Sequence, residues 1–161
     1  MTDENKYSAW IGNKEVTEAL VTAYQADALT ATLNREEPPF KEGDPIPPGW
    51  HLFYIREVVK LADTASDGHP KRGNFLPPID LPRRMWAGTK ATFHRSIHVG
   101  EKINKVSTIE AVTPKVGKTG NLVFLSLRHE INGESGLAVT ELQDVVYREE
   151  AKQGLVAPMP P

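Results

Sequence analysis

Proline is the residue that most constrains this chain, because it lacks an amide hydrogen and is excluded from helix interiors and central strands. The chain has 161 residues and 13 prolines. Most of them fall between Pro38 and Pro82, and from there to residue 150 only Pro114 interrupts the sequence. Regular secondary structure is therefore expected before residue 35 and after residue 82, with a long irregular segment between them.

Before the proline-rich segment the sequence predicts a short extended stretch followed by a helix. Thr22 and Gln25 form a capping-box pattern, in which each side chain satisfies a free amide at the start of a helix. Asn34 together with Pro38 ends the helical segment. The predicted helix therefore lies between Thr22 and Asn34.

From residue 89 onward the hydropathy pattern has a period of two, which predicts strands. The expected strands run from 89 to 95, 103 to 112, 122 to 131 and 136 to 147, and Asn132-Gly133 is a hairpin signal. Gly117-Lys118-Thr119-Gly120 is interpreted as a turn between strands, because it lacks the glycine spacing of a phosphate-binding loop. One helix and four consecutive strands predict an α+β domain, with the helix covering one face of an antiparallel sheet.

The expected organisation is a single domain over residues 1–150, with a proline-rich overhang at 35–82 and a proline-rich tail or linker at 151–161. The overhang carries Trp50 and other aromatic residues, which predicts that it packs on the fold. Its end, Leu81–Ala87, is expected to be a short helix that begins near Pro82 and stops at Gly88.

Composition excludes several classes of function. The formal net charge is −2 at pH 7, so no binding to nucleic acid or to an anionic membrane is expected. The absence of cysteine excludes a thiol nucleophile and a thiolate zinc site. No signal peptide and no apolar run of about 20 residues is visible, so a cytoplasmic location is expected.

The residues on their own do not name a reaction. The five histidines show no metal-ligand spacing and are expected to be exposed or on edge strands, so no metal site is predicted. No serine lies in a nucleophile elbow, and no paired carboxylates are evident. Arg83 and Arg84, next to Trp86, are suited to an acidic or phosphate-bearing ligand, and a salt-bridged surface is the competing interpretation.

Several segments resemble the amino-terminal half of MaoC-like double hot-dog acyl-CoA hydratases and dehydratases, a family that includes mesaconyl-CoA and itaconyl-CoA hydratases. The resemblance covers roughly residues 10–148. It rests on Pro47-Pro48-Gly49-Trp50-His51, on 68–78 and 81–88, on Phe93-His94-Arg95 with Val99-Gly100-Glu101, on 117–124 and on 141–148.

The resemblance implies a hot-dog fold, in which a sheet wraps around a central helix, here expected near Leu81–Ala87, and two such units pair side by side. It implies that water adds across the double bond of an enoyl-CoA, with a carboxylate and a histidine as acid and base. That pair belongs to a Gly-Asp-x-Asn-Pro-x-His signature, which this sequence does not contain. No catalytic residue is therefore expected here, and a second hot-dog unit is the expected partner.

The expected function is the pocket-forming half of an enoyl-CoA hydratase or dehydratase that acts on a short acyl-CoA, with a carboxylated one among the candidates. No cofactor is expected, and CoA enters only as part of the substrate thioester. The predicted substrate-binding residues are Phe75, Arg83, Arg84 and Trp86. Two alternatives remain open: a non-enzymatic hot-dog homodimer that binds an acyl thioester, and a thioesterase whose acid is Asp80, Glu101 or Glu130.

Overall fold

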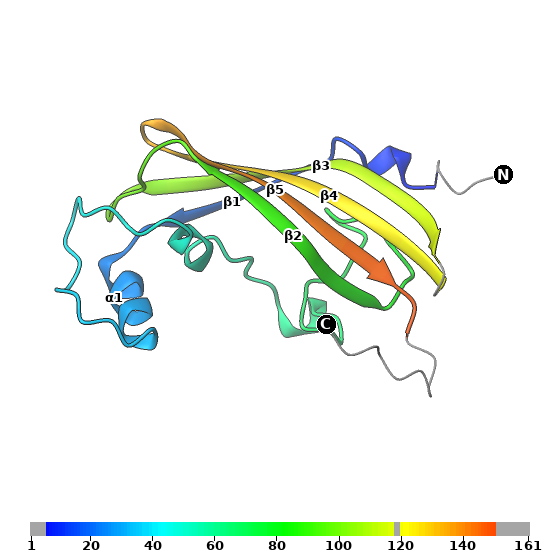
Figure 1. Ribbon diagram of the computed structural model, residues 1–161, viewed down its shortest axis with the longest axis horizontal. Helices are drawn as coiled ribbons and strands as arrows, with labels where there is room; N and C mark the ends of the chain where they lie inside the picture. Colours follow the sequence, from blue (N-terminus) through cyan, green and yellow to red (C-terminus); the bar gives the residue numbers. More distant parts are fainter. Residues whose placement is uncertain (1–5, 118–119, 151–161) are drawn as a thin grey trace, which may run out of the picture.

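A five-stranded antiparallel sheet forms the body of the computed structural model, which describes residues 6–117 and 120–150. The strands lie in the order β1-β3-β4-β5-β2, so that β1 and β2 are its two edges (Figure 1). The elements are β1 (Lys14–Leu20), α1 (Ala23–Thr32), β2 (Arg83–Phe93), β3 (Lys102–Gly117), β4 (Gly120–Gly133) and β5 (Gly136–Arg148), with short 3-10 helices at Ser8–Trp10, Trp50–Phe53 (η3) and Leu61–Asp63.

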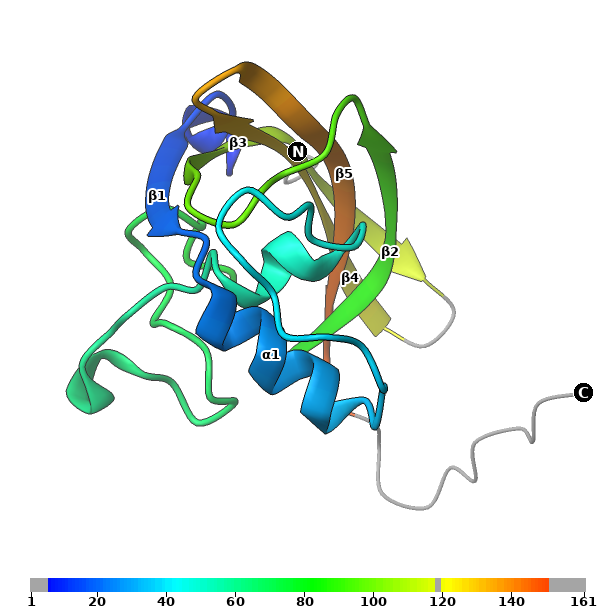
Figure 2. The same cartoon turned by 90° about the vertical axis from the view of Figure 1, so that its left-hand side faces the viewer.

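The helix predicted from the capping box is confirmed as α1. The Thr22 hydroxyl oxygen accepts a hydrogen bond from the amide of Gln25 at 3.3 Å and donates one to the Gln25 side chain at 2.9 Å. The helix ends at Thr32 with Leu33 as its C-cap, and Asn34 takes a left-handed backbone conformation with φ of 51°. The sheet arches over α1 and η3, so the prediction that the helix covers one sheet face is also confirmed (Figure 2).

The helix expected at Leu81–Ala87 is wrong, because these residues lead into the edge strand β2. This strand pairs with β5 from Arg83 opposite Arg148 to Phe93 opposite Val139. A register shift between Trp86 and Gly88 marks a bulge, a feature that glycine often accompanies. The strand's hydrogen-bond partner lies far away in the sequence, whereas the Pro82 and Gly88 signals are purely local.

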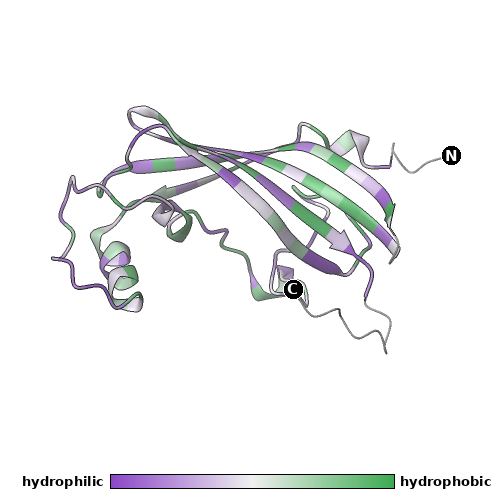
Figure 3. Ribbon diagram, viewed as in Figure 1, coloured by the Kyte–Doolittle hydropathy of each residue, from purple (hydrophilic) through white to green (hydrophobic). Residues whose placement is uncertain are grey.

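The strands predicted from the alternating pattern are confirmed, and Figure 3 shows apolar and polar bands alternating along them. The hairpin predicted at Asn132-Gly133 joins β4 to β5, where Gly133 pairs with Gly136. The pairing of β3 with β4 extends to Gly117 opposite Gly120. The turn expected between these two glycines falls on residues 118–119, and the predicted tail falls on 151–161; both lie outside the described residues.

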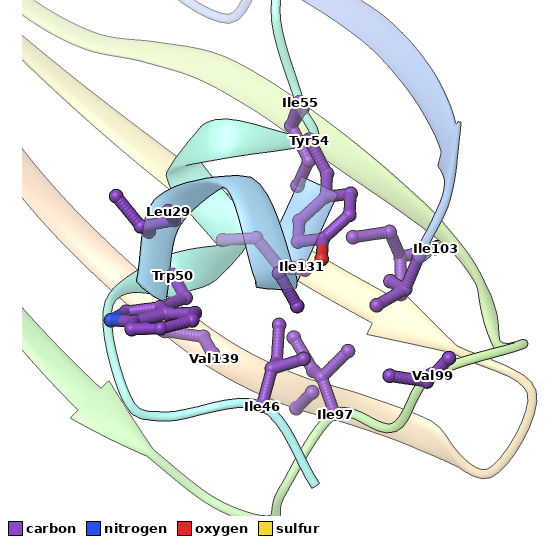
Figure 4. Packing of buried hydrophobic residues seen from close by; sticks show 13 residues of the cluster. Leu29, Ile46, Trp50, Tyr54, Ile55, Ile97, Val99, Ile103, Ile131 and Val139 are labelled. Atoms are coloured by element: carbon purple, nitrogen blue, oxygen red, sulfur yellow. The ribbon is translucent and has the colours of Figure 1, made fainter. Parts of the chain in front are cut away.

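The proline-rich segment contributes to the core. Trp50 is only 8% exposed and packs against Phe40, with 5.8 Å between the ring centres. Figure 4 shows how residues of α1, η3, the strands and the segments that connect them meet in the core: Leu29, Ile46, Trp50, Tyr54, Ile55, Ile97, Val99, Ile103, Ile131 and Val139. Among the described residues, no helix is long and apolar enough to cross a membrane.

Candidate functional site

A row of polar side chains crosses the inner face of the sheet, the face that α1 and η3 cover. Glu15, Ser107, His129 and Glu141 lie directly opposite one another on β1, β3, β4 and β5. Residues paired in this way point to the same face of a sheet. The row separates two apolar clusters, one around Trp50 and Ile131 and the other around Ile109, Leu125 and Tyr147.

His129 is held in the middle of this row by two hydrogen bonds. Its Nε2 lies 3.2 Å from Oε1 of Gln143, and because an amide oxygen only accepts, Nε2 carries the hydrogen. Burial lowers the pKa of His129, so its ring is neutral, and Nδ1 accepts from the Ser107 hydroxyl at 2.8 Å. Ser107 is 1% exposed, which excludes it as a nucleophile that a substrate could reach.

His51 and Glu141 form the second polar pair. Nε2 of His51 lies 3.1 Å from Oε1 of Glu141, and both side chains are buried. Burial by itself would raise the pKa of Glu141, but the hydrogen bond from His51 and the positive charges near it, Lys105 among them, bring the pKa below its ordinary value. The carboxylate is therefore ionised, and it fixes the orientation and the protonated nitrogen of the imidazole.

The backbone before His51 has one strict requirement. Gly49 precedes η3 with φ of 88°, a left-handed conformation that other residues adopt only at a cost. The preceding residues, Pro47 and Pro48, fix the approach of the chain. The Pro-Pro-Gly-Trp-His segment thus turns Trp50 into the apolar core and His51 onto Glu141.

His51 also lines a cavity of about 270 Å³, which we call the His51 cavity. Pro47 and Pro48 form one wall, and residues 93–97, at and beyond the end of β2, form another. The ring of Phe93 meets the His51 ring edge to face, with 6.1 Å between the centres. The cavity is therefore located where the inner layer meets an edge of the sheet.

Arg95 and Glu101 form a structural ion pair beside this cavity. Both guanidinium Nη atoms donate to the Glu101 carboxylate, which also accepts from the amides of His98 and Glu134, each at 3.1 Å. A Cβ at Gly133 would lie 2.0 Å from Glu101 Oε1, so a side chain there would displace the ion pair. Burial raises the pKa of Glu101, but these hydrogen bonds and the Arg95 charge hold it below its ordinary value.

The four predicted substrate-binding residues do not line the His51 cavity. Phe75 is half-buried and packs against the cluster that contains Tyr147. Arg83 and Arg84 lie opposite Arg148 and Tyr147 at the start of β2. Trp86 is 68% exposed, and its indole nitrogen donates to the Thr89 hydroxyl at 2.9 Å. Their role in binding stays a prediction.

The three carboxylates considered for a thioesterase are not brought together. Asp80 is exposed and pairs with Lys6 at 3.1 Å, and Glu130 pairs with Arg128 at the surface. The carboxylate of Glu101 already serves four donors. Each of the three carboxylates is thus held in its own ion pair, and their role in a thioesterase stays a prediction.

Sequence reasoning missed the His51–Glu141 pair, and the expectation that the histidines are exposed or on edge strands is wrong for His51 and His129, which are buried. The sequence does carry a signal for Glu141, one member of the pair. In β5 the inward positions alternate as Val139, Glu141, Gln143 and Val145, so polar residues stand in an otherwise apolar inner series. Within the described residues, no group of three acidic or histidine side chains is placed to hold a metal ion.

Acidification is expected to destabilise the protein in two stages. Because the pKa of His129 is lowered in the folded state, the unfolded state binds its proton first, and the free energy of unfolding falls as the pH drops below about 6.5. Because the pKa values of Glu101 and Glu141 are lowered, a steeper loss follows below about pH 4.3. Urea unfolding at several pH values checks this.

The control for this prediction is a matched pair of histidine variants. His129→Gln is expected to reduce the slope of the free energy of unfolding against pH between pH 7 and 5.5. His69→Gln, at an exposed position, is expected to leave this slope unchanged. An unchanged slope in His129→Gln would contradict the assignment of a neutral buried ring.

Comparison with known proteins agrees with this architecture. The model of a family described as hydroxyacyl-thioester dehydratase type 2 matches residues 49–161. A mesaconyl-C(4)-CoA hydratase from Chloroflexus aurantiacus is 38% identical over 143 residues, which are 89% of this chain and 51% of that relative. The chain therefore spans about half the length of the curated relative that it matches.

Two solved structures share the fold at low sequence identity. The ChsH1–ChsH2 complex from Mycobacterium tuberculosis matches with a TM-score of 0.65 at 14% identity, over 89% of this chain and 88% of that one. The C-terminally truncated HadBC complex, a 3R-hydroxyacyl-ACP dehydratase from the same organism, matches with a TM-score of 0.55 at 12% identity, over 83% and 96%. These likenesses confirm the hot-dog fold. Because the family model spans more than half of the chain, the protein belongs to the hydroxyacyl-thioester dehydratase type 2 family.

Proposed function

We propose that this chain is the pocket-forming half of an acyl-CoA hydratase or dehydratase and that a second hot-dog unit supplies the catalytic aspartate and histidine. The family and the mesaconyl-C(4)-CoA hydratase relative support this class of reaction. The sequence contains no Gly-Asp-x-Asn-Pro-x-His segment. A chain that spans half of that relative is consistent with one hot-dog unit of a pair.

The observation that carries the proposal is the partly covered inner face of the edge strand β2. Trp86 lies opposite the buried Val145, and Phe93 opposite the buried Val139, so both point to the inner face. They are nevertheless 68% and 45% exposed, although the ring of Phe93 contacts His51 of η3, so this edge is only partly covered. An exposed edge strand with large apolar side chains is a site for pairing with another chain.

The proposed chemistry is addition of water to an enoyl-CoA or its removal from a hydroxyacyl-CoA, which makes the assembled protein a hydro-lyase. In this scheme the second unit moves the protons, and this chain encloses the acyl group. No cofactor is needed, because the thioester itself activates the double bond, and backbone amides can polarise its carbonyl.

The test is to assay this chain alone, a signature-bearing hot-dog unit from the same genome alone, and their mixture. Loss of the enoyl-thioester absorbance is expected only in the mixture, with turnover at least about 100-fold above either component, in line with the contribution of a positioned acid and base. Acyl-CoA binding without turnover in every combination would instead support the non-enzymatic homodimer, and hydrolysis to free CoA would support the thioesterase.

A further inference from the structure

The geometry points to a carboxylate-binding role for His51: held by Glu141, it binds the free carboxylate at the end of a short dicarboxylic acyl group. This inference deepens the proposed function and rests on it for the identity of the acyl thioester. It assigns the specificity of the pocket to the buried His51–Glu141 pair, which sequence reasoning did not select.

The first argument is the charge of the His51 cavity. The residues that line it include His51, His94 and Arg95, and no aspartate or glutamate of the described chain lines it. A lining whose ionisable side chains are all basic favours an anionic group over a cationic one.

His51 is the basic group available to a ligand. The Arg95 guanidinium is already paired with the Glu101 carboxylate, and Nε2 of His94 is hydrogen-bonded to the Thr140 hydroxyl at 3.0 Å. Nε2 of His51 is hydrogen-bonded to Glu141, so Nδ1 is the ring nitrogen that remains to bind a ligand. In the protonated ring both nitrogens donate, so His51 can bridge Glu141 and an incoming carboxylate.

The second argument is size. Pockets for whole ligands have volumes of about 300–1,000 Å³, and the His51 cavity, with about 270 Å³, has room for the end of a short acyl chain. Ile46, Ile97 and Val139 line it and lie close together in the core, where they suit a hydrocarbon stem (Figure 4). Apolar walls with one oriented polar group are typical of a site that fixes the direction of its ligand.

The third argument is position. Phe93 is at once a wall of the cavity, a ring neighbour of His51 and a residue of the partly covered edge strand. An acyl group that reacts at a second hot-dog unit docked on β2 reaches the cavity by passing this edge. The thioester then faces the second unit, and the distal carboxylate faces His51.

Direct binding is tested on the full chain labelled with ¹⁵N-histidine. Mesaconate, a small unsaturated dicarboxylate, is titrated to millimolar concentration while the imidazole nitrogen signals are recorded by NMR, and neutral crotonamide is titrated in parallel. The His51 signals, assigned by their loss in His51→Gln, are expected to shift and saturate with mesaconate alone. The His69 signals serve as the exposed internal control and are expected not to move.

Glu141→Gln provides the second measurement, because it removes the charge behind His51 and keeps the shape. Its affinity for mesaconate is expected to fall at least about tenfold, as for a lost charged hydrogen bond. The inference is overturned if the His51 signals do not respond, or if they respond equally to crotonamide. Neither result depends on whether the protein catalyses hydration.

The assembled enzyme separates this inference from the proposed function. For mesaconyl-CoA relative to crotonyl-CoA, His51→Gln is expected to lower the ratio of kcat/KM values at least about tenfold, and His69→Gln is expected to leave it unchanged. An unchanged ratio in an active His51→Gln enzyme overturns the inference and leaves the hydratase standing. If no mixture hydrates either thioester, the proposed function fails, and the mesaconate titration alone decides the role of His51.

Discussion

Trp86→Asp is expected to weaken assembly with the second hot-dog unit strongly and to lower hydration activity with it. Trp86 exposes 68% of its surface on the inner face of β2, and tryptophans at the centre of an interface commonly contribute 2 kcal/mol or more. The dissociation constant should therefore rise at least about 30-fold. Because the side chain is exposed in the single chain, the free energy of unfolding should change by no more than about 0.5 kcal/mol.

The matched control is Tyr24→Asp, which places the same charge at an exposed aromatic residue of α1. It should leave both assembly and activity unchanged. Association is measured by sedimentation velocity or by titration calorimetry. If Trp86→Asp assembles normally and raises only the KM for acyl-CoA, Trp86 belongs to the substrate pocket, as the sequence predicts, and not to the interface.

Glu101→Ala is expected to destabilise the fold by about 3–5 kcal/mol, the range observed when one partner of a buried ion pair is removed. The change leaves the Arg95 guanidinium and the amides of His98 and Glu134 without their acceptor. Domains of this size have a total stability of about 5–15 kcal/mol, so much of it would be lost. Urea denaturation of the isolated chain measures the effect.

Glu130→Ala is the control, because Glu130 pairs with Arg128 at the surface, where both side chains are 39% exposed. An exposed pair contributes about 0–1 kcal/mol. Equal losses in the two variants would contradict the structural role of Glu101. Hydration or hydrolysis that disappears in a Glu101→Ala protein of normal stability would instead make Glu101 a catalytic acid.

The parts of the fold that local chemistry determines could be predicted from the sequence. The cap at Thr22 and the hairpin at Asn132-Gly133 depend on a few neighbouring residues, and both are confirmed. The segment at Pro82–Gly88 carries local helix signals, but its conformation is decided by pairing with β5, which the sequence places more than 50 residues away. Long-range pairing overrode local preference there.

The site was harder to predict than the fold, because its members come from distant parts of the chain. His51 and Glu141 are separated by 90 positions, and neither belongs to a motif with metal-ligand or nucleophile spacing. The family resemblance identified the segment that holds His51 without giving the histidine a role. Only the three-dimensional structure shows that a polar residue inside β5 faces an imidazole at a cavity.

The strand order has a consequence for how the protein is made. β2 is synthesised before β3 and β4, yet its only neighbour in the described sheet is β5, the last strand of the described chain. Because a chain emerges from the ribosome starting with its N-terminus, β2 stays without its ladder until β5 has been translated. The edge that is proposed to receive the second unit is therefore the last part of the described sheet to be completed. The docking surface proposed on β2 thus depends on the translation of β5.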